Sequence, residues 1–404
     1  MSAERQGKRV LVISASVGAG HNQAARAVVE RLRHDAPSLE VEQADSLAFA
    51  GRMFRSYYAG GYALAVSRFP RLYGLGFRIT DRPDTPRRTL AERRRLWSER
   101  RAMRRLGKHI LDGRYDLILH THFLAPSLVA GMLDAGELSC PQAVIVTDNV
   151  IHRYWFSRHV ERWFLSADLD AGRLERWGVD RERVVVSGMP VQAKWRMELD
   201  RSRVLAEWDL PPGQPIVLLS GGTDFVCGPV VRIARELARA REDLCVVVLG
   251  GRNKKLLGQL AGLHLPPERL RPVAFTDRLH ELVEACSLMI TKAGGSTVAE
   301  CAARGKPMVF LKPVPGQEAG NARYFAAAGA GAIAWNVDET IQRTLELVDD
   351  PPRLAAMGQA AGTMYRPAAE TIAEWVIRRL DGERALRQTR DQTDHQSGGG
   401  RRYN

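Results

Sequence analysis

The stretch SASVGAGHNQAA, residues 14–25, places two glycines and a histidine between an apolar run and an amphipathic segment. Gly18 and Gly20 therefore lie at a predicted strand-to-helix junction, where the backbone can approach a ligand closely and free helix N–H groups attract anions. His21 follows directly, and an imidazole can take up or release a proton near neutral pH. The stretch predicts a site for an anion or a polar headgroup; a tight turn with a surface histidine is the alternative.

A second group of polar residues lies within residues 290–321, ITKAGGSTVAECAARGKPMVFLKPVPGQEAGN. Gly294 and Gly295 end a predicted strand and Ser296 opens a helix, so free N–H groups can hold a diphosphate. One turn further, the carboxylate of Glu300 can bind the vicinal hydroxyls of a ribose. A rigid loop set by prolines then presents two amides and a carboxylate that suit sugar hydroxyls, from Gln317, Glu318 and Asn321. This order of groups indicates a ligand with a diphosphate, a ribose and a sugar.

Polar residues also end two further predicted strands, YDLILHTH at residues 115–122 and QAVIVTDN at residues 142–149. In an open α/β sheet, ligands bind beyond the carboxyl ends of the strands. His120, His122 and Asp148 therefore fall where chemistry would be placed, with a capped loop as the alternative.

Apolar strands alternate with helical segments along most of the chain, which predicts a mostly parallel α/β sheet. The pattern restarts at residue 215 after a polar stretch, and the glycine turns at Gly18/Gly20 and Gly221/Gly222 open two Rossmann-like halves. We expect a first domain at residues 1–195, a second domain at residues 203–382, a cleft between them, and a disordered tail at residues 386–404.

The bulk composition is that of an ordinary soluble protein, with 45% hydrophobic and 26% charged residues. Its five cysteines are scattered and form no CxxC pair, so we expect reduced thiols in the cytoplasm and no zinc site. The sequence contains no long apolar run, so we expect neither a signal peptide nor a membrane-spanning helix. The net charge of +13 is the unusual feature, and it indicates an anionic partner.

The basic residues concentrate in one region of the first half. Residues 87–105 hold nine arginines, and residues 53–78 interleave arginines with tyrosines and phenylalanines. Such a mixture suits a bilayer interface, where aromatic rings lie at headgroup depth and arginines meet lipid phosphates. An anionic membrane surface is the predicted partner; ordinary helices with core aromatics and solvated arginines are the alternative.

The motifs together resemble the family 28 glycosyltransferases, and within them the diacylglycerol sugar transferases of the monogalactosyldiacylglycerol synthase and processive diacylglycerol glucosyltransferase type. The matching stretches occur in family order over about residues 8–375: SASVGAGHNQAA, VIVTDNVIHRYW, VSGMPV, MITKAGGSTVAECAARGKPMVF and KPVPGQEAGNA. KAGG stands where the family has Lys-Pro-Gly-Gly, and TDN where it has Thr-Asp-Phe. Either difference would change sugar or acceptor preference without changing the fold.

The resemblance implies a GT-B fold, a UDP-sugar donor held mainly by the second domain, and a lipid acceptor at the membrane side of the first. His21 would be the general base, with Asp148 the second candidate. Lys292 and Arg252 would meet charge on the leaving UDP, so neither a metal nor a cofactor is expected. The remaining residues carried over are, for the donor, Gly294, Gly295, Ser296, Glu300, Gln317, Glu318 and Asn321, and for the acceptor, Gly18, Gly20, His152 and Trp155.

The predicted reaction is inverting transfer of a hexose to a lipid hydroxyl, most simply that of diacylglycerol, by a protein on the inner face of the membrane. Three alternatives remain: a UDP-sugar epimerase of the same fold, a nucleic-acid binder attracted by the positive charge, and a membrane-binding protein without catalysis. The sequence carries no zinc, homeodomain or RNP-type motif, so no nucleic-acid partner is expected. The identity of the sugar is left open.

Overall fold

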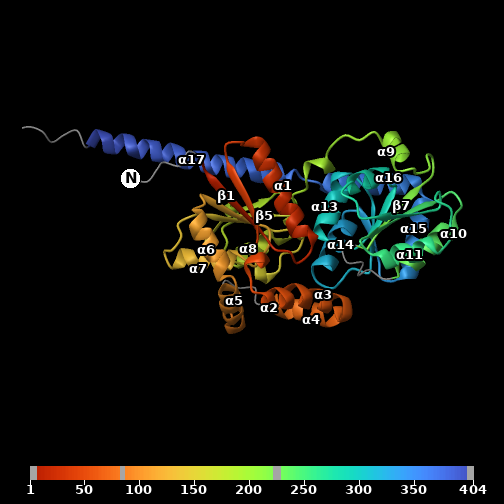
Figure 1. Ribbon diagram of the computed structural model, residues 1–404, viewed down its shortest axis with the longest axis horizontal. Coiled ribbons are helices and arrows are strands. Elements are labelled where there is room, and N and C mark those ends of the chain that lie inside the picture. Colours follow the sequence, from red (N-terminus) through yellow and green to blue (C-terminus); the bar gives the residue numbers. More distant parts are fainter. Residues whose placement is uncertain (1–6, 82–86, 222–228, 398–404) are drawn as a thin grey trace, which may run out of the picture.

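Two parallel sheets organise the chain, one in each half (Figure 1). The computed structural model describes residues 7–81, 87–221 and 229–397. The first sheet has the order β2-β1-β3-β4-β5-β6 and consists of β1 Arg9–Ser14, β2 Glu40–Asp45, β3 Leu117–His120, β4 Gln142–Ile145, β5 Val160–Leu165 and β6 Val184–Val186. The second has the order β12-β11-β10-β7-β8-β9 and consists of β7 Ile216–Ser220, β8 Cys245–Gly251, β9 Leu270–Ala274, β10 Leu288–Thr291, β11 Met308–Leu311 and β12 Gly331–Ala334.

Helices cover both faces of the first sheet, which explains the apolar sequences of its central strands β1, β3 and β4. On one face, α1 (Ala19–Asp35) packs beside α17 (Ala368–Ser397) over Val10 and Val12. On the other face, α6 (Arg104–Gly113) and α7 (Pro126–Asp134) pack over Leu11 and Ile13. A short helix, α8 (Ala171–Arg176), closes the end near β5 and β6.

The second sheet is covered in the same way, and its two apolar clusters lie on opposite faces. One face carries α9 (Arg201–Glu207), α12 (Leu279–Ala285), α13 (Gly295–Ala303), α14 (Gln317–Ala327) and α16 (Pro351–Met364). The other carries α10 (Val230–Ala240), α11 (Lys254–Ala261) and α15 (Val337–Val348). The architecture confirms the predicted α/β class, with two Rossmann-like halves.

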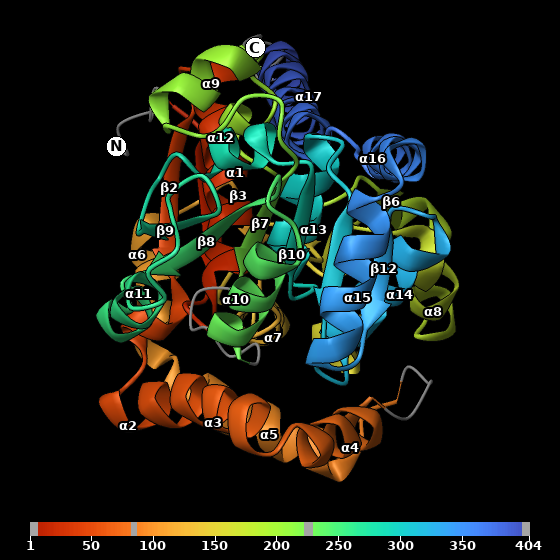
Figure 2. The same cartoon turned by 90° about the vertical axis from the view of Figure 1, so that its right-hand side faces the viewer.

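A separate layer of helices lies along one side of the molecule, beneath both halves (Figures 1 and 2). It consists of α2 (Arg52–Arg55), a π-helical turn (Ser56–Gly60), α3 (Gly61–Arg68), α4 (Pro70–Thr80) and α5 (Leu90–Ala102). Pro70 begins α4 in a position that needs no backbone N–H. A capping box between Thr89 and Glu92 begins α5. This layer holds the region of mixed aromatic and basic residues.

Both sheets have a topological switch point, where the loops after two neighbouring strands diverge and open a crevice. In the first sheet this point lies between β1 and β3, and in the second between β7 and β10. Gly222, which the sequence pattern placed in the turn after β7, lies outside the described residues.

Helix α17 returns from the second half to the first. Ile372, Ala373 and Val376 are fully buried in the core under the first sheet, although the predicted second domain runs to residue 382. The helix continues to Ser397, through a stretch where the sequence predicted disorder. This stretch has few apolar residues, but it also contains neither proline nor glycine before Ser397, so nothing in it interrupts a helix.

Candidate active site

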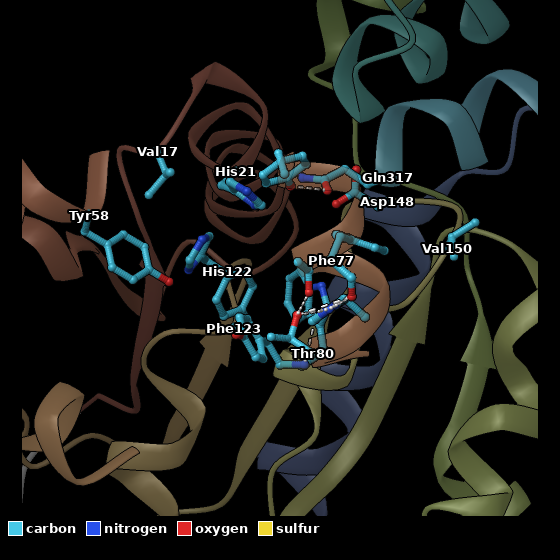
Figure 3. A pocket seen from close by; sticks show the side chains of 15 residues that line it. Val17, His21, Tyr58, Phe77, Thr80, His122, Phe123, Asp148, Val150 and Gln317 are labelled. Carbon is cyan, nitrogen blue, oxygen red and sulfur yellow. Dashed lines mark hydrogen bonds between the residues drawn. The ribbon is translucent and has the colours of Figure 1, made fainter. Parts of the chain in front are cut away.

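A cavity of about 390 Å³ lies at the switch point of the first sheet, closed on one side by α4 (Figure 3). Its walls are largely aromatic, and one residue of the second half, Gln317, completes them. The lining residues are Val17, His21, Tyr58, Tyr73, Gly76, Phe77, Thr80, His122, Phe123, Asp148, Val150, His152, Tyr154, Trp155 and Gln317. The cavity therefore offers an apolar chamber with a few polar groups, which is the usual composition of a small-molecule site.

His21 lies in the first turn of α1 and is held in one tautomer. Its Nδ1 lies 2.8 Å from the carbonyl oxygen of Thr121, which can only accept, so Nδ1 carries the proton. The hydroxyl of Thr147 lies 2.9 Å from the same nitrogen. Burial lowers the pKa of His21 to about 4, so the ring is neutral at physiological pH. Nε2 consequently keeps a lone pair and can accept a proton.

His122 follows β3 and has the opposite tautomer. Its Nδ1 accepts a hydrogen bond of 3.1 Å from the backbone N–H of Leu124, so a neutral ring carries its proton on Nε2. Burial lowers the pKa of His122 well below its usual value, and the nearby His21 adds to the effect. The two imidazoles meet edge to face with centroids 4.5 Å apart. One ring can thus accept and the other donate a hydrogen bond in the same cavity.

Asp148 lies at the cavity wall beside the second half. Burial raises its pKa to about 6; a hydrogen bond from Asn321 opposes this shift, and the nearby charge of Glu318 adds to it. The amide of Asn321 is fully buried, and it accepts from the backbone N–H of Asn149 at 2.8 Å and donates to the carbonyl of Ala293 at 2.9 Å. Asn321, expected to contact a sugar, therefore joins the two halves.

Of the predicted acceptor residues, His152 and Trp155 line the cavity. Both ring nitrogens of His152 also contact the protein backbone. Nε2 lies 3.1 Å from the carbonyl oxygen of Phe77, and Nδ1 accepts a hydrogen bond from the backbone N–H of Tyr154. Gly18 precedes α1 with a φ of 143°, which favours glycine. Gly20 faces the second half, since a β-carbon there would lie 3.4 Å from Oγ of Ser296.

The predicted diphosphate residues lie at the N-terminus of α13, opposite the N-terminus of α1. Gly294 precedes the helix, and Gly295 and Ser296 begin it. Lys292 forms an ion pair of 3.2 Å with Glu318, so these two predicted donor residues lie together. Whether these groups contact a donor stays a prediction.

Of the predicted donor residues only Gln317 lines this cavity, and two of the others, Glu300 and Arg252, have different surroundings. Glu300 is buried on α13, where burial raises its pKa to about 8 and the charge of Lys194 opposes the shift. The guanidinium of Arg252, just after β8, stacks on the ring of Phe275 with its Cζ 4.1 Å from the centroid. Among the described residues, no cluster of three or more His, Cys, Asp and Glu could hold a metal ion.

Sequence reasoning missed the part of the cavity that α4 supplies. Tyr73 and Phe77 belong to the aromatic and basic region expected at a bilayer, but both line the cavity, as Figure 3 shows for Phe77. Their spacing of four residues, with Thr80 one turn later, places them on one face of a helix. That spacing was the available signal. Of the two histidines near the end of β3, His122 lines the cavity, whereas His120 is fully buried.

Comparisons with known proteins agree with this fold. Solved structures with the same fold include Staphylococcus aureus MnaA with UDP (TM-score 0.63, 16% identity, 93% of this chain and 97% of that one) and Acinetobacter baumannii MurG (TM-score 0.59, 17% identity, 92% and 99%). The fold is GT-B, as predicted. Residues 21–191 match the family model of monogalactosyldiacylglycerol (MGDG) synthase, and residues 218–372 match the glycosyltransferase family 28 C-terminal domain.

With both halves matched, the chain belongs to the family 28 glycosyltransferases of the MGDG synthase type. Its curated relatives include a processive diacylglycerol beta-glucosyltransferase of Staphylococcus saprophyticus, 26% identical over 88% of this chain and 88% of the relative. One of the same name from Bacillus cereus strain AH187 is 32% identical over 59% of this chain and 62% of the relative.

Proposed function

We propose that this glycosyltransferase moves a hexose from a UDP-sugar to the hydroxyl of a lipid, most simply diacylglycerol. The observation that carries the proposal is that the neutral His21, with a lone pair on Nε2, lines an aromatic cavity that Gln317 of the second half completes. Apolar walls suit the glycerol and acyl part of a lipid, and a group that accepts a proton suits its hydroxyl. The relatives named diacylglycerol beta-glucosyltransferases support the same substrate class.

In the proposed reaction, the acceptor oxygen attacks the anomeric carbon as the bond from that carbon to the UDP oxygen breaks. The configuration inverts, and the acceptor proton passes to Nε2 of His21. Charge that develops on UDP is stabilised by the N-terminal amides of α13, beginning at Gly295, and by the ammonium of Lys292. Asp148 lines the same cavity, and in the proposed reaction its carboxylate orients the acceptor.

We further propose that the outer side of the helix layer rests on an anionic membrane. Apolar side chains that are exposed on this layer include Met53, Tyr57, Leu64, Phe69, Leu72, Leu75, Ile79, Leu90 and Trp97. Arginines are exposed among them, at Arg52, Arg55, Arg68, Arg71 and Arg78. Exposed apolar patches with basic neighbours are typical of interfacial helices. No helix among the described residues is long and apolar enough to cross a bilayer.

The test is to incubate the purified protein with UDP-glucose, UDP-galactose or UDP-N-acetylglucosamine and vesicles that contain diacylglycerol, and to identify the products by mass spectrometry. We expect UDP and a glycosylated diacylglycerol from one of the donors. Conversion of the free UDP-sugar without lipid would favour an epimerase, and no turnover with any donor would contradict the proposal. A second series with anionic vesicles and rising salt tests the membrane face. Vesicle binding that depends on neither the lipid charge nor the salt concentration would exclude an anionic membrane as the partner of the helix layer.

A further inference from the structure

Helix α4 connects two parts of the molecule that the sequence separates by more than two hundred residues. One side of it lines the cavity through Tyr73, Phe77 and Thr80, and its outer side exposes Leu72 and Ile79. The same helix also touches the loop between β11 and α14, which belongs to the second half. An element of the acceptor side therefore contacts the loop predicted to hold the donor sugar.

Two glycines make this contact close. A β-carbon on Gly74 would lie 2.4 Å from Cβ of Pro315, which leaves no room for a side chain. Gly316 has a φ of 113°, and a β-carbon there would lie 3.1 Å from the ring of Phe77. The helix and the loop thus fit together at the backbone, and the fit requires glycine on both sides.

A hydrogen bond fixes one side chain at this contact. The hydroxyl of Tyr73 donates to Oε1 of Gln317 at a distance of 2.8 Å. Because the oxygen of the amide is engaged, its NH₂ group, with two donors, points away from Tyr73. Gln317 lines the cavity, so that group is available for the oxygen of a hydroxyl (Figure 3).

We propose that Tyr73 is a positioning residue that orients the Gln317 amide toward the hexose of the donor. The proposal rests on the function proposed above and adds a cross-link between its two substrates. The donor sugar site is complete only when α4 is seated on the loop, and α4 is also the wall of the acceptor cavity. Binding of the lipid and of the sugar part of the donor are therefore coupled, and the coupling acts equally in both directions.

The first experiment compares the affinities for UDP and for the UDP-sugar that wild-type protein uses. Tyr73→Phe should raise the KM for the UDP-sugar about fivefold to tenfold, the value of one hydrogen bond, and leave the Kd for UDP unchanged, because UDP lacks the hexose. Gly74→Ala should have the same effect by displacing α4. A variant with general structural damage would weaken both ligands equally, and that result, or an unchanged KM, would overturn the proposal.

Matched controls are available for both substitutions. Tyr324→Phe removes a hydroxyl from a partly buried tyrosine on α14, the helix that begins at Gln317. Gly61→Ala adds a methyl where a β-carbon meets nothing within 4 Å. Both controls should keep the wild-type KM for the UDP-sugar.

The second experiment measures the coupling in a His21→Ala background, where turnover is slow enough for binding to be measured. Calorimetry gives the affinity for the UDP-sugar with and without vesicles that contain diacylglycerol. We expect the lipid to tighten donor binding, and Tyr73→Phe to remove that gain. Equal gains with and without Tyr73 would overturn the proposal. Absence of sugar transfer by wild-type protein would instead contradict the function itself, and the comparison of UDP with UDP-sugar separates the two failures.

Discussion

Gly295 and Thr147 belong to different halves of the molecule, yet a β-carbon on Gly295 would lie 2.1 Å from the carbonyl oxygen of Thr147. Thr147 also places its hydroxyl 2.9 Å from Nδ1 of His21. The start of α13, where the donor diphosphate is expected, thus lies directly against the residue that supports the proposed base. The glycine at this position is needed for the close approach of the two halves, beyond any contact with a ligand.

Gly295→Ala should force the halves apart at this point. We expect a loss of about 1–3 kcal/mol in the free energy of unfolding, the usual effect of overpacking, together with a large loss of turnover. Chemical denaturation and the activity assay measure the two effects. Gly258→Ala, on the exposed side of α11 with no atom within 4 Å of a new β-carbon, is the control and should not destabilise the protein. Normal activity of Gly295→Ala would disprove the need for this contact.

His21→Ala should lower turnover about 100-fold or more, because no general base then accepts the proton of the acceptor hydroxyl. The Kd for UDP should stay within a factor of about two, because His21 lies on the acceptor side and the proposed UDP contacts are on α13. Single-turnover kinetics and calorimetry measure these quantities. Near-normal turnover would exclude His21 as the base.

The pH dependence separates His21 from Asp148. His21, with a pKa lowered to about 4, stays neutral above that pH, whereas Asp148, with a pKa raised to about 6, loses its charge as the pH falls through 6. We therefore expect kcat/KM to fall below pH 6 in the wild type. In Asp148→Asn the residual activity should fall only near pH 4, where His21 takes up a proton. An acid limb that stays near pH 6 in Asp148→Asn would contradict this assignment.

The opposed tautomers of His21 and His122 can be observed directly. In ¹⁵N-histidine NMR spectra, we expect His21 to carry its proton on Nδ1 and His122 on Nε2. His122→Phe should raise the KM for the lipid about fivefold to tenfold by removing one donor, and His122→Gln, which keeps an N–H near Nε2, should do so less. The reverse tautomers, or equal effects of both variants, would show that His122 does not donate to the acceptor.

Two exposed methionines test the membrane face. Met53 on α2 is 88% exposed within the helix layer, and Met197, 56% exposed, precedes α9, which lies on the side of the molecule opposite α2 (Figure 2). Met53→Glu should weaken binding to anionic vesicles about tenfold or more, since burial of one apolar side chain contributes about 1.5–3 kcal/mol. Met197→Glu should bind like wild type. Vesicle sedimentation measures the binding of both variants. An equal loss of binding in the two would show that the helix layer is not the membrane face.

Periodicity predicted eleven of the strands, because most of them are apolar runs with a turn signal after them; the edge strand β2 is mixed, with only Val41 and Ala44 buried. The exception is β12, whose sequence Gly331–Ala334 is made of small residues and gives little strand signal. The return of α17 to the first sheet could not be predicted either. Its apolar residues fit either half, and only packing against Val28 and Leu32 of α1 shows which one they cover.

The site was predictable where function depends on local motifs and not where it depends on contacts between distant segments. His21 and Asp148, which local motifs singled out, line one cavity, because strand ends converge at a switch point; their roles in the reaction stay predictions. The roles of Asn321 and Tyr73 arise from partners more than a hundred residues away, at Asn149 and Gln317. No local pattern reports such pairs.

The return of α17 has a mechanical consequence. The polypeptide passes from the first half to the second before β7 and returns to the first before α17, so two segments of the chain connect the halves. A single tether would let the halves swing and twist freely, whereas a pair of tethers restricts them to a hinge-like rotation about one axis. The second connection therefore limits how far the two halves can twist relative to each other.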